Sequence, residues 1–226
     1  MAITHIFFDL DGTLVHSFPG IAFSANSAVS RVLPDLTAPD FLPYIGPPIR
    51  EIFRQALREE NPEKLFLLEQ AFRKSYDSEG WTKTTAFPGV AKTLGSLREA
   101  NITCFVLTNK PHRPTQAILR HLGLETFFAN VFTPDTRTPH FVSKVEAALD
   151  ARDRMGLPAG KGMIVGDSLD DAAAAEACGF QFAAATSGYG TAHLQQRHPV
   201  HYRLARFDDL LGSSLSDQIL QSSSAS

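Results

Sequence analysis

Short apolar runs alternate with longer amphipathic stretches through most of the chain. The apolar runs have the length and composition of buried strands and lie at 3–8, 102–107, 130–132, 162–165 and 181–185. Helical periodicity follows them at 89–100, 114–122, 142–155 and 170–178. This alternation predicts an α/β fold in which a parallel sheet carries helices on both faces. Functional sites in such folds lie outside the carboxyl ends of the strands.

The alternation of apolar runs and helical patterns is interrupted after the first predicted strand. Residues 15–86 contain helical patterns at 21–33, 49–60 and 63–79 and no convincing strand. We therefore expect a helical domain over 15–86, inserted into a core formed by 1–14 and 87–226. Near the end of the chain, 188–190 should form a turn and 202–211 an edge strand with a short helix. The small polar residues 221–226 predict a mobile tail.

Composition narrows the possible functions. A chain of 226 residues with 43% hydrophobic content can bury a substantial core. A net charge of −3 gives no electrostatic reason to bind nucleic acid or an anionic membrane. No apolar run approaches the roughly 18 residues of a membrane span, and no cleavable leader is recognisable. We expect a cytoplasmic enzyme, monomeric or homodimeric, without nucleic-acid or membrane partners.

Two carboxylates follow the first apolar run, in Asp9-Leu10-Asp11-Gly12. Where a strand breaks into a turn, such a pair can lean toward one side of the sheet. Adjacent anions with only oxygen donors favour a hard cation such as Mg²⁺, and an aspartate beside Mg²⁺ and a phosphate can act as a covalent nucleophile. The alternative is an ordinary Asp-rich turn after a strand.

Three further polar elements stand at strand ends or helix starts. Thr108-Asn109 follows the second strand, Lys144 opens a helix, and Gly166-Asp167-Ser168-Leu169-Asp170-Asp171 follows the fourth strand. A helix cap explains the Thr-Asn pair equally well, and Lys144 could be a solvated lysine. Adjacent side chains on a helix point about 100° apart, so Asp170 and Asp171 should not both coordinate one ion equally. Asp170 is better explained as an acidic residue in the first turn of the helix, where its negative charge interacts favourably with the helix dipole.

These four motifs, in this order, resemble the haloacid dehalogenase superfamily and its phosphoglycolate phosphatase-like branch. The resemblance implies a Rossmann-like sheet with an inserted helical cap domain. It also implies Mg²⁺-dependent hydrolysis of a small phosphorylated metabolite through an aspartyl-phosphate. Asp9 would be the nucleophile and Asp11 the general acid and base. The expected metal ligands are Asp9, the carbonyl of Asp11, Asp167 and Asp171, with Lys144 as the third catalytic residue.

The resemblance also suggests substrate-binding residues. Thr13, Thr108 and Asn109 would hold the phosphoryl group. Arg50, after Gly46-Pro47-Pro48, could bind a remote substrate anion; the alternative is a surface arginine paired with Glu51 or Glu59.

Two points stay open at this stage. Many relatives have Lys-Pro where this chain has Lys144-Val145, so Arg137 or Lys110 could take the place of Lys144. A phosphomutase, a pyrophosphatase or a non-catalytic binding module on the same fold are the alternative functions.

Overall fold

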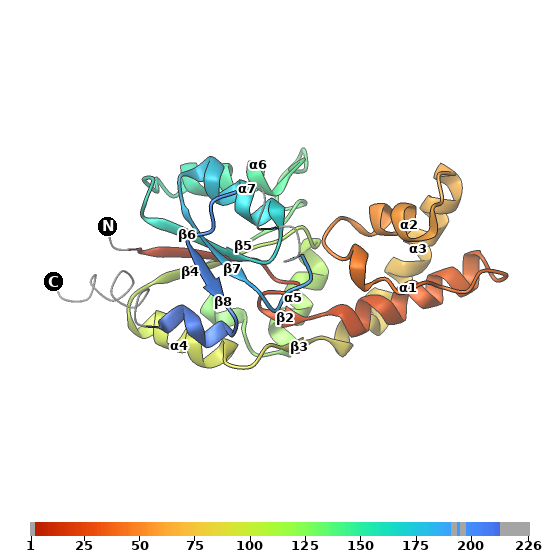
Figure 1. Ribbon diagram of the computed structural model, residues 1–226, viewed down its shortest axis with the longest axis horizontal. Coiled ribbons are helices and arrows are strands. Elements are labelled where there is room, and N and C mark those ends of the chain that lie inside the picture. Colours follow the sequence, from red (N-terminus) through yellow and green to blue (C-terminus); the bar gives the residue numbers. More distant parts are fainter. Residues whose placement is uncertain (1–2, 191–193, 195–197, 213–226) are drawn as a thin grey trace. The chain divides into compact units, whose positions relative to one another are not determined.

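A six-stranded parallel sheet forms the centre of the larger part of the protein (Figure 1), in a computed structural model that describes residues 3–190, 194 and 198–212. The strand order is β5-β4-β1-β6-β7-β8, and every neighbouring pair is parallel. The strands are β1 (His5–Phe8), β4 (Thr103–Leu107), β5 (Asn130–Phe132), β6 (Gly162–Gly166), β7 (Gln181–Ala185) and β8 (Tyr202–Leu204).

Four helices cover this sheet. They are α4 (Val90–Glu99), α5 (His112–His121), α6 (Lys144–Arg154) and α7 (Leu169–Cys178). In Figure 1, α6 and α7 lie on one side of the strands and α4 and α5 on the other. The predicted fold class, a Rossmann-like parallel sheet with helices on both faces, is confirmed.

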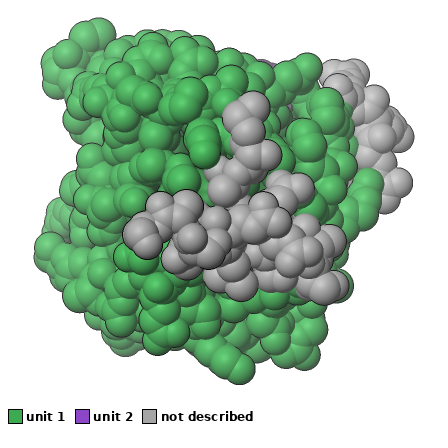
Figure 2. Space-filling view, turned by 90° about the vertical axis from the view of Figure 1, so that its left-hand side faces the viewer, with its two compact units in different colours: residues 1–15, 86–226 green, residues 16–85 purple. Residues whose placement is uncertain are grey.

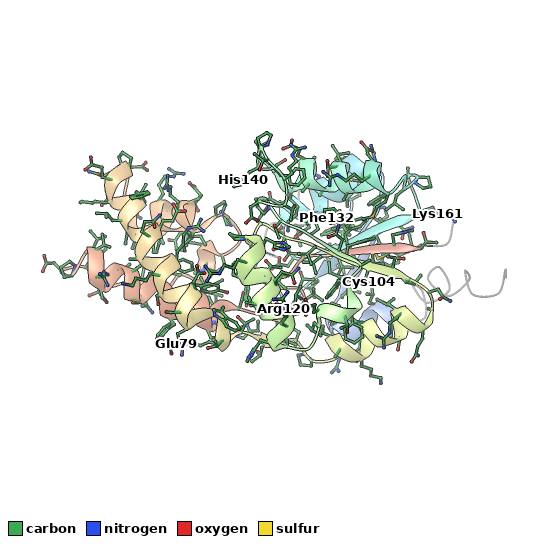
Figure 3. All side chains as sticks on the ribbon, turned by 180° about the vertical axis from the view of Figure 1, so that it is seen from behind. Glu79, Cys104, Arg120, Phe132, His140 and Lys161 are labelled. Carbon is green, nitrogen blue, oxygen red and sulfur yellow. The ribbon has the colours of Figure 1, made fainter. Side chains whose placement is uncertain are left out.

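Aromatic residues fill the core beneath α6 and α7. Phe7 is central: its ring stacks on Phe105 at 4.7 Å and on Phe180 at 5.8 Å between centroids. Phe132, labelled in Figure 3 with Cys104, lies 6.2 Å from Phe7. Each such aromatic pair adds about 0.5–1.5 kcal/mol beyond the burial of its area. This packing fixes β1, β4 and β5 side by side and so sets where their carboxyl ends lie.

The chain divides into two compact units. Unit 1 comprises residues 1–15 and 86–226 and is drawn in green in Figure 2. Unit 2 comprises residues 16–85 and contains α1 (Phe18–Val32), α2 (Ile49–Leu57) and α3 (Pro62–Ser78). Short 3₁₀ helices complete the described elements: η1 (Leu42–Tyr44), η2 (Gly80–Lys83), η3 (Glu125–Phe127) and η5 (Phe207–Leu211).

The expectation that 15–86 holds no strand was wrong at its two ends. The two-residue strands β2 (Val15–His16) and β3 (Thr85–Ala86) pair with each other where the chain leaves and re-enters unit 1. Two residues are too few to give a recognisable alternation of polar and apolar positions, which is why the sequence pattern missed them. The expected mobile tail, 221–226, lies outside the described residues.

Local sequence explains the helices of unit 2. Asn61 caps α3, because its side chain accepts hydrogen bonds from the backbone N–H groups of Glu63 and Lys64. Gly20 in α1 lies so close to Gly80 that a Cβ at Gly20 would be 2.1 Å from the Gly80 carbonyl oxygen. Only glycine therefore allows this close approach.

Among the described helices, none has the length and apolarity needed to cross a bilayer.

Candidate active site

Three buried aspartates converge at the carboxyl end of the sheet. Carboxylate oxygens of Asp9, Asp167 and Asp171 all lie within 4.8 Å of one another. Asp9 directly follows β1, and its backbone N–H donates to the Val165 carbonyl at 2.9 Å, which continues the β1–β6 pairing. Asp167 directly follows β6, and Asp171 lies in the first turn of α7. The sheet thus brings together residues about 160 positions apart, as expected for neighbouring parallel strands.

Lys144 lies between two of these carboxylates. Its ammonium donates to Asp9 Oδ1 at 2.6 Å and to Asp171 Oδ1 at 2.7 Å, and its side chain is 3% exposed. Burial lowers the pKa of Lys144, but Asp171 and Asp9 outweigh this effect and raise the pKa above its ordinary value. Lys144 is therefore a fixed cation. Ser143 caps α6 by accepting a hydrogen bond from the Glu146 N–H, which orients the start of this helix.

Arg137 does not take the position of Lys144 between Asp9 and Asp171. Its guanidinium pairs with Glu146 and lies 3.8 Å from Asp150, on the outer part of α6.

Asp170 and Asp171 have separate environments. Asp171 is fully buried, and its Oδ2 accepts hydrogen bonds from the Ser168 N–H at 3.0 Å and hydroxyl at 2.6 Å. Ser168 in turn accepts from the Asp171 N–H, which completes a capping box at the start of α7. Asp170 instead accepts a hydrogen bond from Asn109 Nδ2 at 3.0 Å. The geometry places Asp171, and not Asp170, in the carboxylate cluster.

A glycine-flanked loop holds Asp167. The backbone N–H groups of Tyr189 and Gly190 donate to Asp167 Oδ2 at 2.5 and 3.1 Å. A Cβ at Gly188 would lie 2.3 Å from Asp167 Cβ, and a Cβ at Gly12 would lie 2.3 Å from Asp167 Oδ2. From the sequence we expected only a turn at 188–190. The pair of glycines flanking one aromatic residue was the available signal that another group approaches this backbone closely.

Asp11 stands apart from the three clustered aspartates. Its Oδ2 lies 3.1 Å from the Lys110 ammonium, and their side chains are 19% and 9% exposed. Within the described residues, Asp11 Oδ1 has no hydrogen-bond partner. Gly12 follows with a φ of 88°, a conformation that favours glycine, and turns the chain directly after this aspartate. The contact between Lys110 and Asp11 was not anticipated from the sequence.

The residues expected to bind the phosphoryl group are near the ends of β1 and β4. Thr108 is buried, and its hydroxyl accepts a hydrogen bond from the Lys110 N–H at 3.2 Å. Thr13 is 2% exposed, and its hydroxyl has no hydrogen-bond partner among the described residues. Asn109 donates to Asp170, as noted above. Contact of these side chains with substrate stays a prediction.

Arg50 lies in unit 2 with a carboxylate partner of its own. Its Nε donates to Glu69 Oε2 at 2.7 Å, and its guanidinium lies 6.0 Å from the centre of the Phe66 ring. Glu51 and Glu59, the partners considered from the sequence, pair with Arg54 and Lys64 instead. The substrate-binding role of Arg50 stays a prediction.

The ionisable side chains of the site carry an excess of negative charge. Asp9, Asp11, Asp167 and Asp171 contribute four negative charges when ionised, and Lys110 and Lys144 contribute two positive charges, which leaves −2. Burial raises the pKa of Asp9, and burial together with Asp171 raises the pKa of Asp167 to about 6. Both shifts express the cost of holding excess negative charge in a buried place. A divalent cation with a preference for oxygen ligands fits this donor set and this charge.

The chain is similar to known proteins over most of its length. Residues 6–185 match the family model for haloacid dehalogenase-like hydrolases. A phosphoglycolate phosphatase of Pectobacterium atrosepticum is 31% identical over 93% of this chain and 92% of its own length. The tyrosine-protein kinase PtkA of Mycobacterium tuberculosis is also 31% identical, over 83% of this chain; the match spans 63% of that relative's length.

The fold has solved counterparts. A haloacid dehalogenase-like family hydrolase of Streptococcus pneumoniae superposes with a TM-score of 0.80, at 24% identity, over 92% of this chain and 97% of its own. At that identity the superposition supports the fold alone. The family match extends from β1 to the end of β7 and includes all four polar motifs. This chain therefore belongs to the haloacid dehalogenase-like hydrolase family, as its motifs suggested.

Proposed function

We propose that this protein is a Mg²⁺-dependent phosphatase that hydrolyses a small phosphorylated metabolite, similar to phosphoglycolate, through an aspartyl-phosphate on Asp9. The observation that carries the proposal is the arrangement of the two aspartates after β1. Asp9 lies in the carboxylate cluster with Lys144, whereas Asp11 lies outside it against Lys110. Two carboxylates in different environments suit two different roles, nucleophile and acid-base catalyst.

The reaction would proceed in two steps, formation and hydrolysis of the aspartyl-phosphate. A carboxylate oxygen of Asp9 attacks phosphorus, the bond from phosphorus to the ester oxygen breaks, and Asp11 gives its proton to the leaving alcohol. Water then attacks the phosphoryl group while Asp11 takes a proton from it, which releases phosphate and restores Asp9. Lys144 holds Asp9 Oδ1 at 2.6 Å, so the nucleophile has little freedom to rotate.

Mg²⁺ would be held by Asp9, Asp167 and Asp171, with the Asp11 carbonyl as a further ligand. When bound, the ion neutralises charge on the phosphoryl oxygens that otherwise repels the nucleophile. Tyr189 and Gly190 orient Asp167 through their N–H groups, and Ser168 orients Asp171. Thr108, Asn109 and Thr13 would bind the remaining phosphoryl oxygens.

Unit 2 would serve as the cap domain. Its insertion directly after the nucleophile, through the short paired strands β2 and β3, is the arrangement that a hinged cap requires. Closure would exclude water and bring the cap's side chains to the part of the substrate remote from phosphorus.

The test is turnover of a panel of small phosphate esters with and without Mg²⁺, combined with rapid-quench trapping of the phosphoenzyme. Activity should be abolished by a chelator and restored by Mg²⁺, and ³²P from a labelled substrate should be found on Asp9. Full activity in excess chelator, or label on another residue, would refute the proposal.

The same panel separates the alternative functions. Sugar monophosphates supplied with a bisphosphate activator test a phosphomutase, and inorganic pyrophosphate tests a pyrophosphatase. Because the PtkA relative is 31% identical to this chain over 191 residues, ATP with a tyrosine-containing peptide should be included. Binding of phosphate esters without turnover of any of them would identify a non-catalytic module.

A further inference from the structure

One hydrogen bond joins two polar side chains that follow strands on either side of β1. Asn109 Nδ2 donates to Asp170 Oδ2 at 3.0 Å, although the two residues are 61 positions apart in the chain. Asn109 follows β4, and Asp170 lies in the first turn of α7, after β6. In the sheet, β1 lies directly between β4 and β6. The hydrogen bond therefore connects the two strand ends that flank the strand leading to Asp9.

The backbone at both ends of this hydrogen bond is held in place. Before Asn109, the N–H of Thr108 donates to the Phe132 carbonyl at 3.0 Å, which ties the end of β4 to β5. At the other end, the capping box at the start of α7 encloses Asp170. With both backbones fixed, the main freedom left to Asn109 is rotation of its side chain, and Asp170 restricts that rotation.

Asp170 also determines which way the Asn109 amide faces. An ionised carboxylate can only accept hydrogen bonds, so the amide must present its NH₂ group, and not its carbonyl oxygen, to Asp170. The second N–H of the same group can then donate to another acceptor. The terminal torsion of asparagine is roughly twofold, so without Asp170 the amide could turn by 180° at little cost. The carbonyl oxygen would then stand in place of the donor, and it would repel a phosphoryl oxygen.

We infer that Asp170 is a positioning residue, which orients the Asn109 amide so that its second N–H donates to a phosphoryl oxygen. This inference rests on the proposed phosphatase function and adds a residue to it. Asp170 acts through Asn109 and needs no contact with substrate or metal. Its carboxylate thus has a use beyond the interaction with the helix dipole that the sequence suggested.

Preorganisation sets the size of the effect. A side chain that is already oriented loses less freedom when the ligand binds, and ordering one free side chain typically weakens binding by about 3- to 10-fold. Asn109 would hold the phosphoryl group in the ground state and the transition state alike. Loss of such an interaction raises KM and leaves kcat unchanged.

The test uses two variants of Asp170 and a matched control. Asp170→Ala removes the acceptor, whereas Asp170→Asn removes the charge and keeps an oxygen that can accept from Asn109. The control is Glu176→Ala, which removes another exposed carboxylate near the opposite end of α7, one that pairs with His198 at 2.6 Å. Calorimetry gives the Kd of inorganic phosphate in the presence of Mg²⁺, and steady-state kinetics give KM and kcat for phosphoglycolate.

Asp170→Ala should raise the Kd of phosphate and the KM by about 3- to 10-fold, with kcat within twofold of wild type. Asp170→Asn and Glu176→Ala should stay within about twofold of wild type in all three quantities. Equal losses in Asp170→Ala and Asp170→Asn would overturn the inference and assign Asp170 to the helix dipole. No loss in Asp170→Ala would overturn it as well.

A double-mutant cycle tests whether Asp170 acts through Asn109. In an Asn109→Ala background, Asp170→Ala should have no further effect on the Kd of phosphate, because the amide that it orients is gone. A loss of the same size in both backgrounds would show that Asp170 acts independently of Asn109, which would overturn the inference.

A readout without turnover separates this inference from the proposed function. NMR of ¹⁵N-labelled protein resolves the two side-chain amide protons of Asn109, which Asn109→Ala identifies. Their separation should change in Asp170→Ala and be largely kept in Asp170→Asn. Wild-type protein that turns over no phosphate ester would refute the phosphatase proposal, and these signals together with the Kd of phosphate would still decide the role of Asp170. Identical signals in wild type and Asp170→Ala would refute that role whether or not turnover is seen.

Discussion

Lys144 and Asp9 lie 135 residues apart in the chain and form a buried ion pair, with the ammonium 2.6 Å from Asp9 Oδ1. The same ammonium reaches Asp171 at 2.7 Å, so one cation bridges two of the three clustered carboxylates. The proposed nucleophile is thus held by the first residue of α6, a helix that lies between β5 and β6 in the chain. Stability and catalysis should both depend on this contact.

Lys144→Met should destabilise the metal-free protein. It leaves Asp9 and Asp171 buried beside Asp167 with no counter-charge, and breaking a buried pair in this way typically costs about 3–5 kcal/mol. Urea unfolding at pH 7 would measure the loss, and added Mg²⁺ should recover part of it. Lys92→Met, on the surface of α4, serves as the control. A loss below about 1 kcal/mol would mean that the ion pair contributes little.

The two aspartates after β1 should fail in different ways when made neutral. Asp9→Asn should eliminate both turnover and phosphoenzyme, because the amide cannot attack phosphorus. Asp11→Asn should keep the nucleophile but slow both steps, by the roughly 10²–10⁴-fold typical of general acid-base catalysis. Rapid-quench measurements on both variants would distinguish them. Phosphoenzyme formation by Asp9→Asn would rule out Asp9 as the nucleophile.

Gly188→Ala should weaken Mg²⁺ binding without removing any proposed ligand. The new Cβ would lie 2.3 Å from Asp167 Cβ and 2.6 Å from the Gly12 carbonyl oxygen, so Asp167 must shift. Loss of groups that orient a metal ligand typically costs about 10- to 100-fold in affinity. Titration calorimetry would measure it. The matched control is Gly95→Ala in α4, where a Cβ would meet nothing within 4 Å; equal Mg²⁺ affinities in the two variants would contradict the role of the loop.

Stability of the metal-free protein should fall as the pH rises toward neutrality. The pKa of Asp167 is raised to about 6, from an ordinary value near 4, by burial and by Asp171. The folded protein therefore holds a proton on Asp167 that the unfolded chain releases earlier. This contribution to stability is complete below about pH 4 and is lost as the pH passes 6.

Mg²⁺ should reverse this trend, because it competes with the proton for Asp167. The increase in Tm on adding Mg²⁺ should be larger at pH 7.5 than at pH 5.5. Differential scanning calorimetry with and without the ion, at both pH values, would measure it. Equal increases would show that Asp167 does not exchange a proton for the metal.

Arg50→Ala should lower kcat/KM for phosphoglycolate by about one to two powers of ten and leave that for a neutral aryl phosphate almost unchanged. The guanidinium has Glu69 as a partner at 2.7 Å, but its side chain is 52% exposed, where such pairs are worth little, so Arg50 can exchange Glu69 for a substrate anion. Steady-state kinetics with both substrates would test this. Equal losses on both would assign Arg50 to folding or cap closure, and no loss on either would leave it a surface arginine.

Much of the architecture could be read from the sequence, because its signals are local. The apolar runs at 3–8 and 162–165 correspond to β1 and β6, since a strand buried on both faces needs an unbroken apolar segment. Asp9 and Asp167 were expected at the site because each stands just beyond such a run, where parallel strands end at one edge of a sheet, and in a motif that resembles one of the family's. The short strands β2 and β3 were missed because two residues carry no pattern.

Which side chains pair with one another could not be predicted from the sequence. Asp170 and Asp171 are both first-turn acids, and only the capping box with Ser168 and the position of Lys144 show which one is buried in the cluster. Arg50 could equally have faced Glu51 or Glu59, and the folded chain gives it Glu69.

The sequence by itself determined the strands, the helices between them and the polar residues at the strand ends, because these depend on neighbours along the chain. Only the tertiary structure decided that Lys110 contacts Asp11 and that the 188–190 loop holds Asp167. These contacts join residues from different strand ends, and their energies depend on distances of a few ångströms that no spacing along the chain encodes.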